Sequence, residues 1–596
     1  MIRFSDKIKD YTGPNPFSDS QARNFSDEKV IDEFYPISKF WNLFNDQHEI
    51  LLGTRGSGKT FLLKMMRYSM LKQISDPKAE KLVKEKEFIS IYVPMYLEFV
   101  ASFSNSQFTK RNQVIFFQIG FNCKLSEALI TELKSILDDI EDKTIRTEIM
   151  FSLVEYLNRV WFGESDPEIY DFSMLSSKIV EMFYNIEWDN IDLNEIPAVF
   201  KRQICSPLLV SKTMITKMLK LEKEPTWIVC IDEAEFLNEE LLKCINNIFR
   251  SDSNRIALKV ATLPYYHRTL NTLVPNVTVA DGNDFSFRVV DLNYENVDFI
   301  ALTNKLCKHR LQQRFNCQLN CPDLETFLGL IGNDDQIDYY RAEVGEENSQ
   351  RKVIEDKIIS GCSPKRRENA KNYSNKRKTI YDKYAPILFM REMYELSKTG
   401  NHKPGWFAGA KNVRKLSQGN PRIYIQIMND LFEKARKTPL SPKVQHEVIM
   451  KFSKRFCDET QALEKKGPVI YKELKKISSY LQDKVHSGYL KTTGISFFLK
   501  YSEETEFKKS REWLELAIAY SRITVDDEIK ICGIKHDTKF MLSNIYAMAY
   551  WLPIRSDSPE NIVLSHMETN AYVVKAMKKT KPEWTQLSLF DEVQND

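Results

Sequence analysis

The residues best suited to chemistry lie in a glycine-rich segment near the start of the chain. A short apolar run, Ile50 to Leu52, leads into G-T-R-G-S-G-K-T and then into apolar residues at helical spacing. A phosphate-binding loop needs this order of strand, loop and helix, because glycines let backbone N–H groups curl around phosphates at a helix N-terminus. We expect Lys59 to reach the β and γ phosphates and Thr60 to bind Mg²⁺. The expected nucleotide-binding residues are Gly53, Thr54, Arg55, Gly56, Ser57, Gly58, Lys59 and Thr60.

A second apolar run ends in two acidic residues. Trp227 to Ile231 are followed by Asp232 and Glu233. We expect Asp232 to hold Mg²⁺ through water and Glu233 to polarise the attacking water. The alternative is a plain surface turn, but carboxylates directly after five apolar residues are costly unless a metal or solvent meets them. ATP and Mg²⁺ are therefore the expected ligands.

The elements that position these residues form an α/β pattern. Residues 88–99 read as a strand, and residues 100–205 read as a long helical insertion. A later apolar run ends at Thr262, which we expect beside the γ-phosphate as a polar sensor. The segment VVDLNYENVDFI reads as the next strand and its exit. We therefore predict an αβα P-loop NTPase core that ends near residue 300.

Beyond this core, a helix is expected to end near Ser417, and Gly419, Asn420, Pro421 and Arg422 open another. With these features in this order, the chain resembles bacterial AAA+ ATPases of the origin-recognition-complex-like group, which are related to STAND ATPases. The resemblance covers residues 14–440, more weakly over 100–205. It implies that Arg422 lies over the phosphates as the residue called sensor 2, and that the Asn-Pro-Phe turn in GPNPFSDSQARNF lies near the adenine. An ordinary residue at a helix start is the alternative for Arg422.

We expect five parts along the chain. They are an N-terminal arm (1–40), the ATPase core with its insertion (41–300), a helical lid with a basic loop (301–440), a mostly helical C-terminal domain (441–580) and a flexible tail (581–596). The resemblance implies a winged helix within 441–580. A compact protein-interaction domain fits the same apolar spacing, so both interpretations stay open.

The net charge excludes a uniformly basic DNA-binding protein. The 596 residues include 85 basic and 82 acidic side chains, for a net charge of +3. Any nucleic-acid contact must therefore come from locally segregated charge. Residues 365–378 hold seven basic side chains and one acidic one. Phosphate-backbone contact with DNA and a solvated loop both fit this stretch, and its DNA-binding candidates are Lys365, Arg366, Arg367, Lys376, Arg377 and Lys378.

The end of the chain carries a second partner signal. Gln586, Leu587, Ser588, Leu589 and Phe590 follow Pro582 in an acidic segment. This pentapeptide resembles the motif with which bacterial replication and repair proteins bind the β sliding clamp, the glutamine forming a hydrogen bond and the leucine and phenylalanine filling an apolar pocket. The alternative is that these apolar side chains pack back onto their own domain.

Other patterns set limits on compartment, metal and assembly. No run of about eighteen apolar residues and no secretory signal is present, so we expect a cytoplasmic protein without a membrane partner. Zinc at Cys307, His309, Cys317 and Cys321 competes with a plain helix and loop, because paired CxxC knuckles are absent. A homo-oligomer with a shared active site needs an arginine finger, and Arg250, Arg255 and Arg268 are equal candidates.

The motifs of the sequence are compatible with three functions. The first is an ATP-hydrolysing AAA+ ATPase that acts on or near DNA, recruited to the sliding clamp and serving anti-phage defence or mobile-element maintenance. The second is a STAND-like ATP-dependent sensor switch of a defence system. The third is a clamp- and DNA-associated scaffold with structural nucleotide. Nuclease chemistry is not expected, because no further acidic cluster with a paired lysine stands out.

Overall fold

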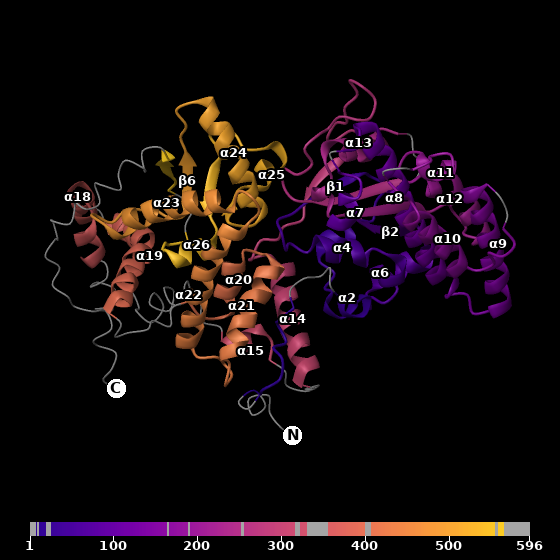
Figure 1. Ribbon diagram of the computed structural model, residues 1–596. Coiled ribbons are helices and arrows are strands. Elements are labelled where there is room, and N and C mark those ends of the chain that lie inside the picture. Colours follow the sequence, from indigo (N-terminus) through magenta and orange to yellow (C-terminus); the bar gives the residue numbers. More distant parts are fainter. Residues whose placement is uncertain are drawn as a thin grey trace.

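A computed structural model describes residues 8, 11–19, 25–105, 107–163, 166–188, 191–251, 256–315, 322–329, 356–372, 374–399, 407–554 and 558–564. Two halves lie side by side in Figure 1, an N-terminal half drawn in indigo to magenta and a C-terminal half drawn in orange to yellow. The predicted tail motif, residues 586–590, lies outside the described residues, as do Arg255, Cys317 and Cys321.

The N-terminal half is built on a five-stranded parallel sheet. Four of its strands are almost wholly buried, which is why they read as largely apolar runs, and the fifth, at one edge, is only half-buried. The strand order is β2-β3-β4-β1-β5. The strands are β1 (Glu49–Leu52), β2 (Phe88–Pro94), β3 (Thr226–Asp232), β4 (Ile256–Thr262) and β5 (Ser286–Val289).

Two strand boundaries differ from the prediction. The strand expected over 88–99 ends at Pro94, because the chain turns there into a short helix that begins at Leu97. The strand expected from Val289 onward instead ends there, so Asp291 stands in the exit segment. In both cases only the end of a strand differs from the prediction, and the core is α/β as predicted.

Other helices of the N-terminal half lie outside the insertion between β2 and β3. They are α2 (Asp27–Glu33), α3 (Ser38–Trp41), α4 (Lys59–Met65), α5 (Tyr68–Leu71), α6 (Pro77–Glu85) and α13 (Glu239–Phe249). Between β2 and β3 the chain forms a helical insertion, drawn in purple at the right of Figure 1. Its helices are α7 (Leu97–Ala101), α8 (Lys110–Leu137), α9 (Lys143–Phe162), α10 (Phe172–Tyr184), α11 (Ala198–Lys201) and α12 (Ser206–Met218).

Helix α8 is the centre of this insertion. Among the described helices it alone is long and apolar enough to cross a membrane by length and composition, and 67% of its most apolar window is buried inside the fold. It packs against β2, α10 and α12. Its apolar character is therefore accounted for by a core position.

A helical layer follows the sheet. It comprises α14 (Val297–Phe315), α15 (Leu324–Leu328), α18 (Pro364–Asn372), α19 (Ser374–Thr399), α20 (Ala410–Ser417) and α21 (Pro421–Lys434). The expectation of a basic loop at 365–378 was wrong, because α18 and α19 occupy this stretch. Pro364 suits a first helical position, and no glycine interrupts residues 364–399.

The C-terminal domain combines helices with a small sheet. Its sheet has the order β7-β8-β6-β9, with β6 antiparallel to β8 and parallel to β9. The strands are β6 (Ser496–Leu499), β7 (Ile523–Thr524), β8 (Lys539–Leu542) and β9 (Glu560–Ile562). The helices are α22 (Pro442–Glu459), α23 (Gly467–His486), α24 (Glu504–Ala519), α25 (Asp527–Cys532) and α26 (Asn544–Ala549).

Candidate nucleotide-binding site

The carboxyl ends of three adjacent strands meet at the phosphate-binding loop. Because the sheet is parallel and β1 pairs with β4, Leu52 lies opposite Thr262. The N–H of Gly53 donates to the Thr262 carbonyl at 3.3 Å. Strand β3 lies on the other side of β4 and ends at Asp232. The loop, the acidic strand end and Thr262 are therefore brought to one edge, as predicted for neighbouring strands of this core.

The loop itself is wound for anion binding. Gly58 is the N-cap of α4 with φ of 95°, a left-handed conformation that favours glycine, and a Cβ there would meet nothing within 4 Å. The first N–H groups of α4 have no partner within the helix, as at any helix N-terminus. A helix N-terminus beside an open glycine loop suits a phosphate group.

Lys59 and the acids of β3 face this space. The Lys59 ammonium is buried and donates to the carbonyls of Gly53 at 2.7 Å and Thr54 at 3.3 Å. Burial lowers its pKa, and the carboxylates of Glu235 and Asp232 partly oppose that shift. A buried cation whose hydrogen bonds go to backbone carbonyls can exchange them for phosphate oxygens, which are stronger acceptors.

Asp232 and Glu233 differ in their surroundings. The Asp232 carboxylate is buried and accepts hydrogen bonds from the Tyr92 hydroxyl at 2.8 Å and the Glu233 N–H at 3.0 Å. Glu233 adopts φ of 57°, which is uncommon for a residue with a side chain, and it is only partly buried. The fixed Asp232 suits a metal held through water, and the more exposed Glu233 suits water activation.

Glu235 is a third acid at this site, and the sequence reasoning missed it. It lines the same pocket as Lys59, and its Oε2 atom is buried without a hydrogen-bond partner among the described residues. Burial raises the pKa of Glu235 to about 7, against the opposing charge of Lys59. The signal was present in the motif D-E-A-E, whose last acid lies one 3₁₀ turn after Asp232.

The start of α21 closes the other side of the pocket. Asn420 caps this helix, its Oδ1 accepting from the N–H groups of Arg422 at 3.1 Å and Ile423 at 3.3 Å. The same side chain donates from Nδ2 to the Arg55 carbonyl at 3.0 Å. The sequence predicted both the helix end at Ser417 and the new helix opened by Pro421, and the structure confirms them. Asn420 thereby joins the lid helix to the phosphate-binding loop.

Gly419 allows this close approach. Its φ is 78°, and a Cβ there would lie 1.9 Å from the carbonyl oxygen of Leu292, which follows β5. No other residue fits between the α20–α21 turn and the segment after β5. The phosphate-binding loop and the start of α21 line opposite sides of one pocket. Its residues include Arg55, Gly56, Ser57, Gly58, Lys59, Thr60, Asp232, Glu233, Glu235, Leu263 and Arg422.

These observations test whether the site suits a nucleotide and a metal. The hydroxyls of Ser57 and Thr262 are buried and, like the Glu235 oxygen, have no partner among the described residues. Unpaired buried polar atoms are uncommon in folded proteins and mark places where a ligand completes the hydrogen bonding. Thr60 and Asp232 line the same pocket, and a hydroxyl and a carboxylate are oxygen donors of the kind Mg²⁺ prefers. The residues present fit both groups.

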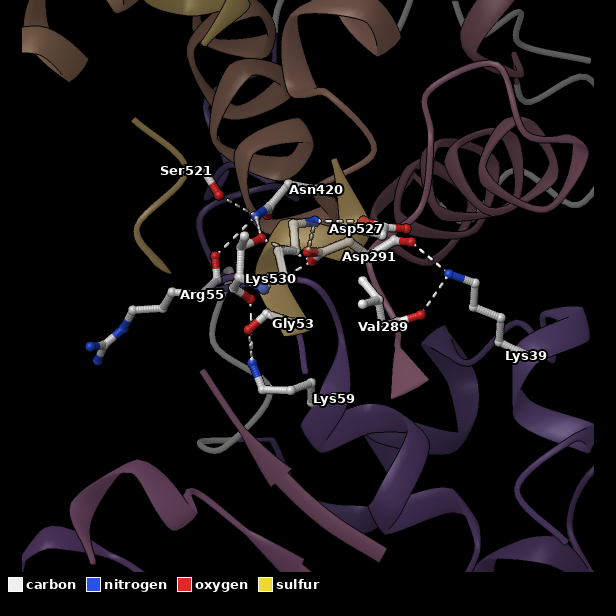
Figure 2. Close-up of polar contacts among 11 residues, drawn as sticks. Lys39, Gly53, Arg55, Lys59, Val289, Asp291, Asn420, Ser521, Asp527 and Lys530 are labelled. Carbon is white, nitrogen blue, oxygen red and sulfur yellow. Dashed lines mark hydrogen bonds and ion pairs between the residues drawn. The ribbon is translucent and has the colours of Figure 1, made fainter. Parts of the chain in front are cut away.

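A network behind the loop was not predicted. Thr54 donates to Asp291 Oδ1 from its N–H at 2.9 Å and from its hydroxyl at 3.0 Å. Lys530 from α25 donates to Asp291 Oδ2 at 2.7 Å, as Figure 2 shows. Lys39 holds the same segment through the carbonyls of Val289 and Asp291. A sequence signal existed, since Asp291 directly follows the valine pair Val289 and Val290 at the end of β5.

The other predicted residues lie outside this pocket. Arg250 is paired with Asp284 at 3.0 Å, and Arg268 lies over the Tyr266 ring. Of the predicted DNA-binding residues, Arg366 donates to the Tyr384 hydroxyl and Arg367 to the Cys362 carbonyl. The other four are Lys365, which is exposed, and Lys376, Arg377 and Lys378, which lie on α19.

The N-terminal turn contacts the lid helix, and Cys307 of the cysteine cluster lies on α14. Asn15 donates to the Asn429 carbonyl at 2.8 Å, so the Asn-Pro-Phe turn lies against α21. Cys307 is buried on α14, and no group of three metal-ligating side chains occurs among the residues described.

Comparison with known proteins agrees with this architecture. No curated protein matches the chain. The model of the ORC-CDC6-like family matches residues 15–561, which include the core, the lid and most of the C-terminal domain. This family is of the AAA+ P-loop type, whose members typically are ATPases and use a nucleotide with Mg²⁺. The chain belongs to the ORC-CDC6-like family.

Proposed function

We propose that this chain binds ATP with Mg²⁺ and hydrolyses it, using the lid to couple the nucleotide to the position of the C-terminal half. The observation that carries the proposal is the convergence of Lys59, Glu233 and Arg422 on one pocket from three separate elements. These elements are the phosphate-binding loop, the end of β3 and the start of α21. Three buried side-chain oxygens, of Ser57, Thr262 and Glu235, have no hydrogen-bond partner among the described residues, and a bound nucleotide with its metal would supply partners for them.

Each side chain has a role that its position supports. Lys59 exchanges the Gly53 and Thr54 carbonyls for β and γ phosphate oxygens, while the N–H groups at the start of α4 bind the same phosphates. Thr60 and Asp232 would hold Mg²⁺, which would supply positive charge against the charge that develops on the transferred phosphoryl group. Tyr92 fixes the Asp232 carboxylate by its hydrogen bond.

The remaining groups act on the γ-phosphate end. Glu233 orients and polarises the attacking water, since it follows the fixed Asp232 and is less buried. The unpaired Thr262 hydroxyl at the end of β4 is available to the γ-phosphate or to that water. Arg422 begins the lid helix, so its guanidinium connects the phosphates to the lid.

The Glu233→Gln variant tests this assignment. It keeps the size of the side chain and removes the group that polarises water, so we expect ATP binding to persist and steady-state turnover to fall by about a hundredfold or more. Glu239→Gln is the matched control, because Glu239 is an exposed acid at the start of α13. Normal turnover in Glu233→Gln would overturn the assignment.

Action on DNA and at the sliding clamp is the wider proposal. The basic residues of α18 and α19 support DNA contact, and the Gln586–Phe590 pentapeptide supports clamp binding. A winged helix within the C-terminal domain is part of the same proposal. DNA affinity that falls steeply with salt would support the first point, and a flat salt response would reject it. Clamp binding that survives deletion of residues 586–596 would reject the second.

A sensor switch is the second candidate, and one observation favours it. The C-terminal domain contacts the phosphate-binding loop directly through Ala519 and Tyr520, and Lys530 reaches it indirectly through Asp291. Turnover stimulated by DNA favours the first function, and turnover only with a foreign trigger favours the switch. A protein that binds nucleotide and shows no turnover under either condition is a scaffold.

A further inference from the structure

One contact between the C-terminal domain and the phosphate-binding loop runs through a largely buried carboxylate. Asp291, on the segment after β5, receives both hydrogen bonds of Thr54 on Oδ1 and the Lys530 ammonium on Oδ2. Thr54 belongs to the loop, and Lys530 belongs to α25, far along the chain. One carboxylate therefore shares its two oxygens between the nucleotide site and the C-terminal domain (Figure 2).

The charges at this point are strongly interdependent. Burial alone would raise the pKa of the Asp291 carboxyl, but Lys530 and the Thr54 N–H hold it below the ordinary value. In the same way burial would lower the pKa of Lys530, and the carboxylates of Asp291 and Asp527 raise it. The Lys530 side chain is only 9% exposed, whereas Asp527 is 61% exposed. Asp291 is therefore the partner that matters for the buried lysine.

A chain of contacts leads from this pair to Lys59. Thr54, which Asp291 holds by its N–H and its hydroxyl, accepts from the Lys59 ammonium on its carbonyl oxygen at 3.3 Å. Only one residue separates the Asp291 carboxylate from the cation that binds phosphate. The position of Thr54 therefore affects the position of Lys59.

A second contact fixes the next residue of the loop to the same domain. The Arg55 N–H donates to the Ala519 carbonyl at 2.8 Å, and its guanidinium donates to the Tyr520 hydroxyl at 2.7 Å. Tyr520 in turn donates to Glu464 at 2.7 Å. Asn420 lies between Arg55 and Ser521, so the lid takes part in the same junction. Two consecutive loop residues are thus held from the C-terminal domain.

We propose that Asp291 is a positioning residue of the phosphate-binding loop and that the C-terminal domain, by supplying Lys530 as its counter-ion, tightens nucleotide binding when it is docked. This rests on the proposed nucleotide site. Docking holds the phosphate-binding loop in the conformation described above. The loop therefore loses less conformational entropy when the phosphates bind, which favours binding. By linkage, nucleotide must then stabilise the docked domain by the same factor.

The first test is equilibrium binding of ADP and a non-hydrolysable ATP analogue to the full chain. Lys530→Met removes the charge and keeps the apolar stem, and we expect it to raise the Kd about fivefold or more, the lower end of usual couplings between sites. Asp527→Asn is the matched control, because it removes only the exposed carboxylate on the same lysine. We expect its Kd to stay within about twofold of the wild-type value.

The second readout is hydrogen exchange of residues 519–532 with and without nucleotide. In the wild-type chain, nucleotide should slow exchange in this segment, and in Lys530→Met this protection should be lost. A role limited to folding of the C-terminal domain would change basal exchange in this segment without removing the response to nucleotide. The two readouts together therefore separate coupling from simple stability.

Lys530→Met leaves the Asp291 carboxylate buried without its cation, so the variant can fail to fold. In that event Asp291→Asn combined with Lys530→Met decides the question, since it removes both charges while an amide oxygen still accepts from Thr54. This pair should fold and still bind nucleotide more weakly. Affinity equal to or tighter than that of the wild-type chain, in either folded variant, overturns the proposal. If the wild-type chain binds no nucleotide, the proposed function itself fails and this inference falls with it.

Discussion

The double role of Asn420 can be separated by two substitutions. Its Oδ1 caps α21, and its Nδ2 bonds the Arg55 carbonyl. Serine retains the cap but is too short to reach Arg55, whereas alanine loses both. Loss of a cap costs about 1 kcal/mol, and loss of one neutral hydrogen bond costs about 1 kcal/mol.

The expected changes in the free energy of unfolding follow from these values. Asn420→Ser should lose about 1 kcal/mol and Asn420→Ala about 2 kcal/mol. Asn420 is buried, at 4% exposure, so solvent does not replace the lost bond fully. Urea unfolding monitored by circular dichroism measures both differences, provided the slope with urea is unchanged.

Nucleotide affinity supplies the second half of this test. The bridge to Arg55 is lost in both variants, so we expect both to bind ADP about fivefold more weakly, as 1 kcal/mol corresponds to that factor. The cap should therefore affect stability alone, and the bridge should affect both quantities. Wild-type affinity in Asn420→Ser would refute the reasoning that the lid and the loop are joined through this side chain. Equal stabilities of the two variants would refute the contribution of the cap.

Three further predictions concern charge, protons and packing. Glu235→Gln removes a negative charge close to Lys59, so we expect it to tighten ADP binding about threefold or more at pH 8. The effect should shrink below pH 7, because the wild-type carboxyl, with its pKa of about 7, takes up a proton there. Calorimetry that shows weaker ADP binding by the variant at pH 8 would contradict this prediction. Burial lowers the pKa of four histidines to about 4; they are His48, His267, His446 and His486. Because the unfolded chain takes up protons at a higher pH than the folded chain, the free energy of unfolding should fall between pH 6.5 and pH 4, by roughly 1–2 kcal/mol per histidine at pH 5. A urea midpoint that is higher at pH 5 than at pH 7 would refute this prediction. Gly419→Ala places a Cβ against the Leu292 carbonyl and should lower the free energy of unfolding by on the order of 3 kcal/mol or more. The control Gly488→Ala, at φ of 60° in open space, should lower it by about 1 kcal/mol. Equal urea midpoints for the two variants would show that the contact at Gly419 is not tight.

The sequence predicted the parts of the site that depend on local order along the chain. The phosphate-binding loop, the acids after β3, Thr262 at a strand end and the new helix at Pro421 each follow an apolar run or a helix signal. Parallel strands bring their carboxyl ends together, so Lys59 and Asp232 could be placed at one edge without a structure. The roles assigned to these residues stay predictions until they are measured.

What the sequence could not predict depends on contacts between distant segments. The Asp291–Lys530 pair joins residues that are 239 positions apart, and nothing in the local pattern around Lys530 indicates its partner. Asn420 was expected only among the residues that open a helix, because its bond to the Arg55 carbonyl goes to a loop 365 residues away. The basic stretch was predicted to be a loop because of its high charge, although no glycine interrupts it. It forms α18 and α19, in keeping with the helix propensity of its residues.

The central claim is that the pocket between the phosphate-binding loop and α21 binds ATP. Equilibrium titration of the full chain with a fluorescent ATP analogue and Mg²⁺, in wild-type and Lys59→Ala forms, tests it most directly. We predict saturable binding by the wild-type chain that excess ATP displaces, and a Kd raised about tenfold or more by Lys59→Ala, since a charged hydrogen bond to phosphate is lost. The absence of saturable binding, or equal affinity in both forms, would contradict the account.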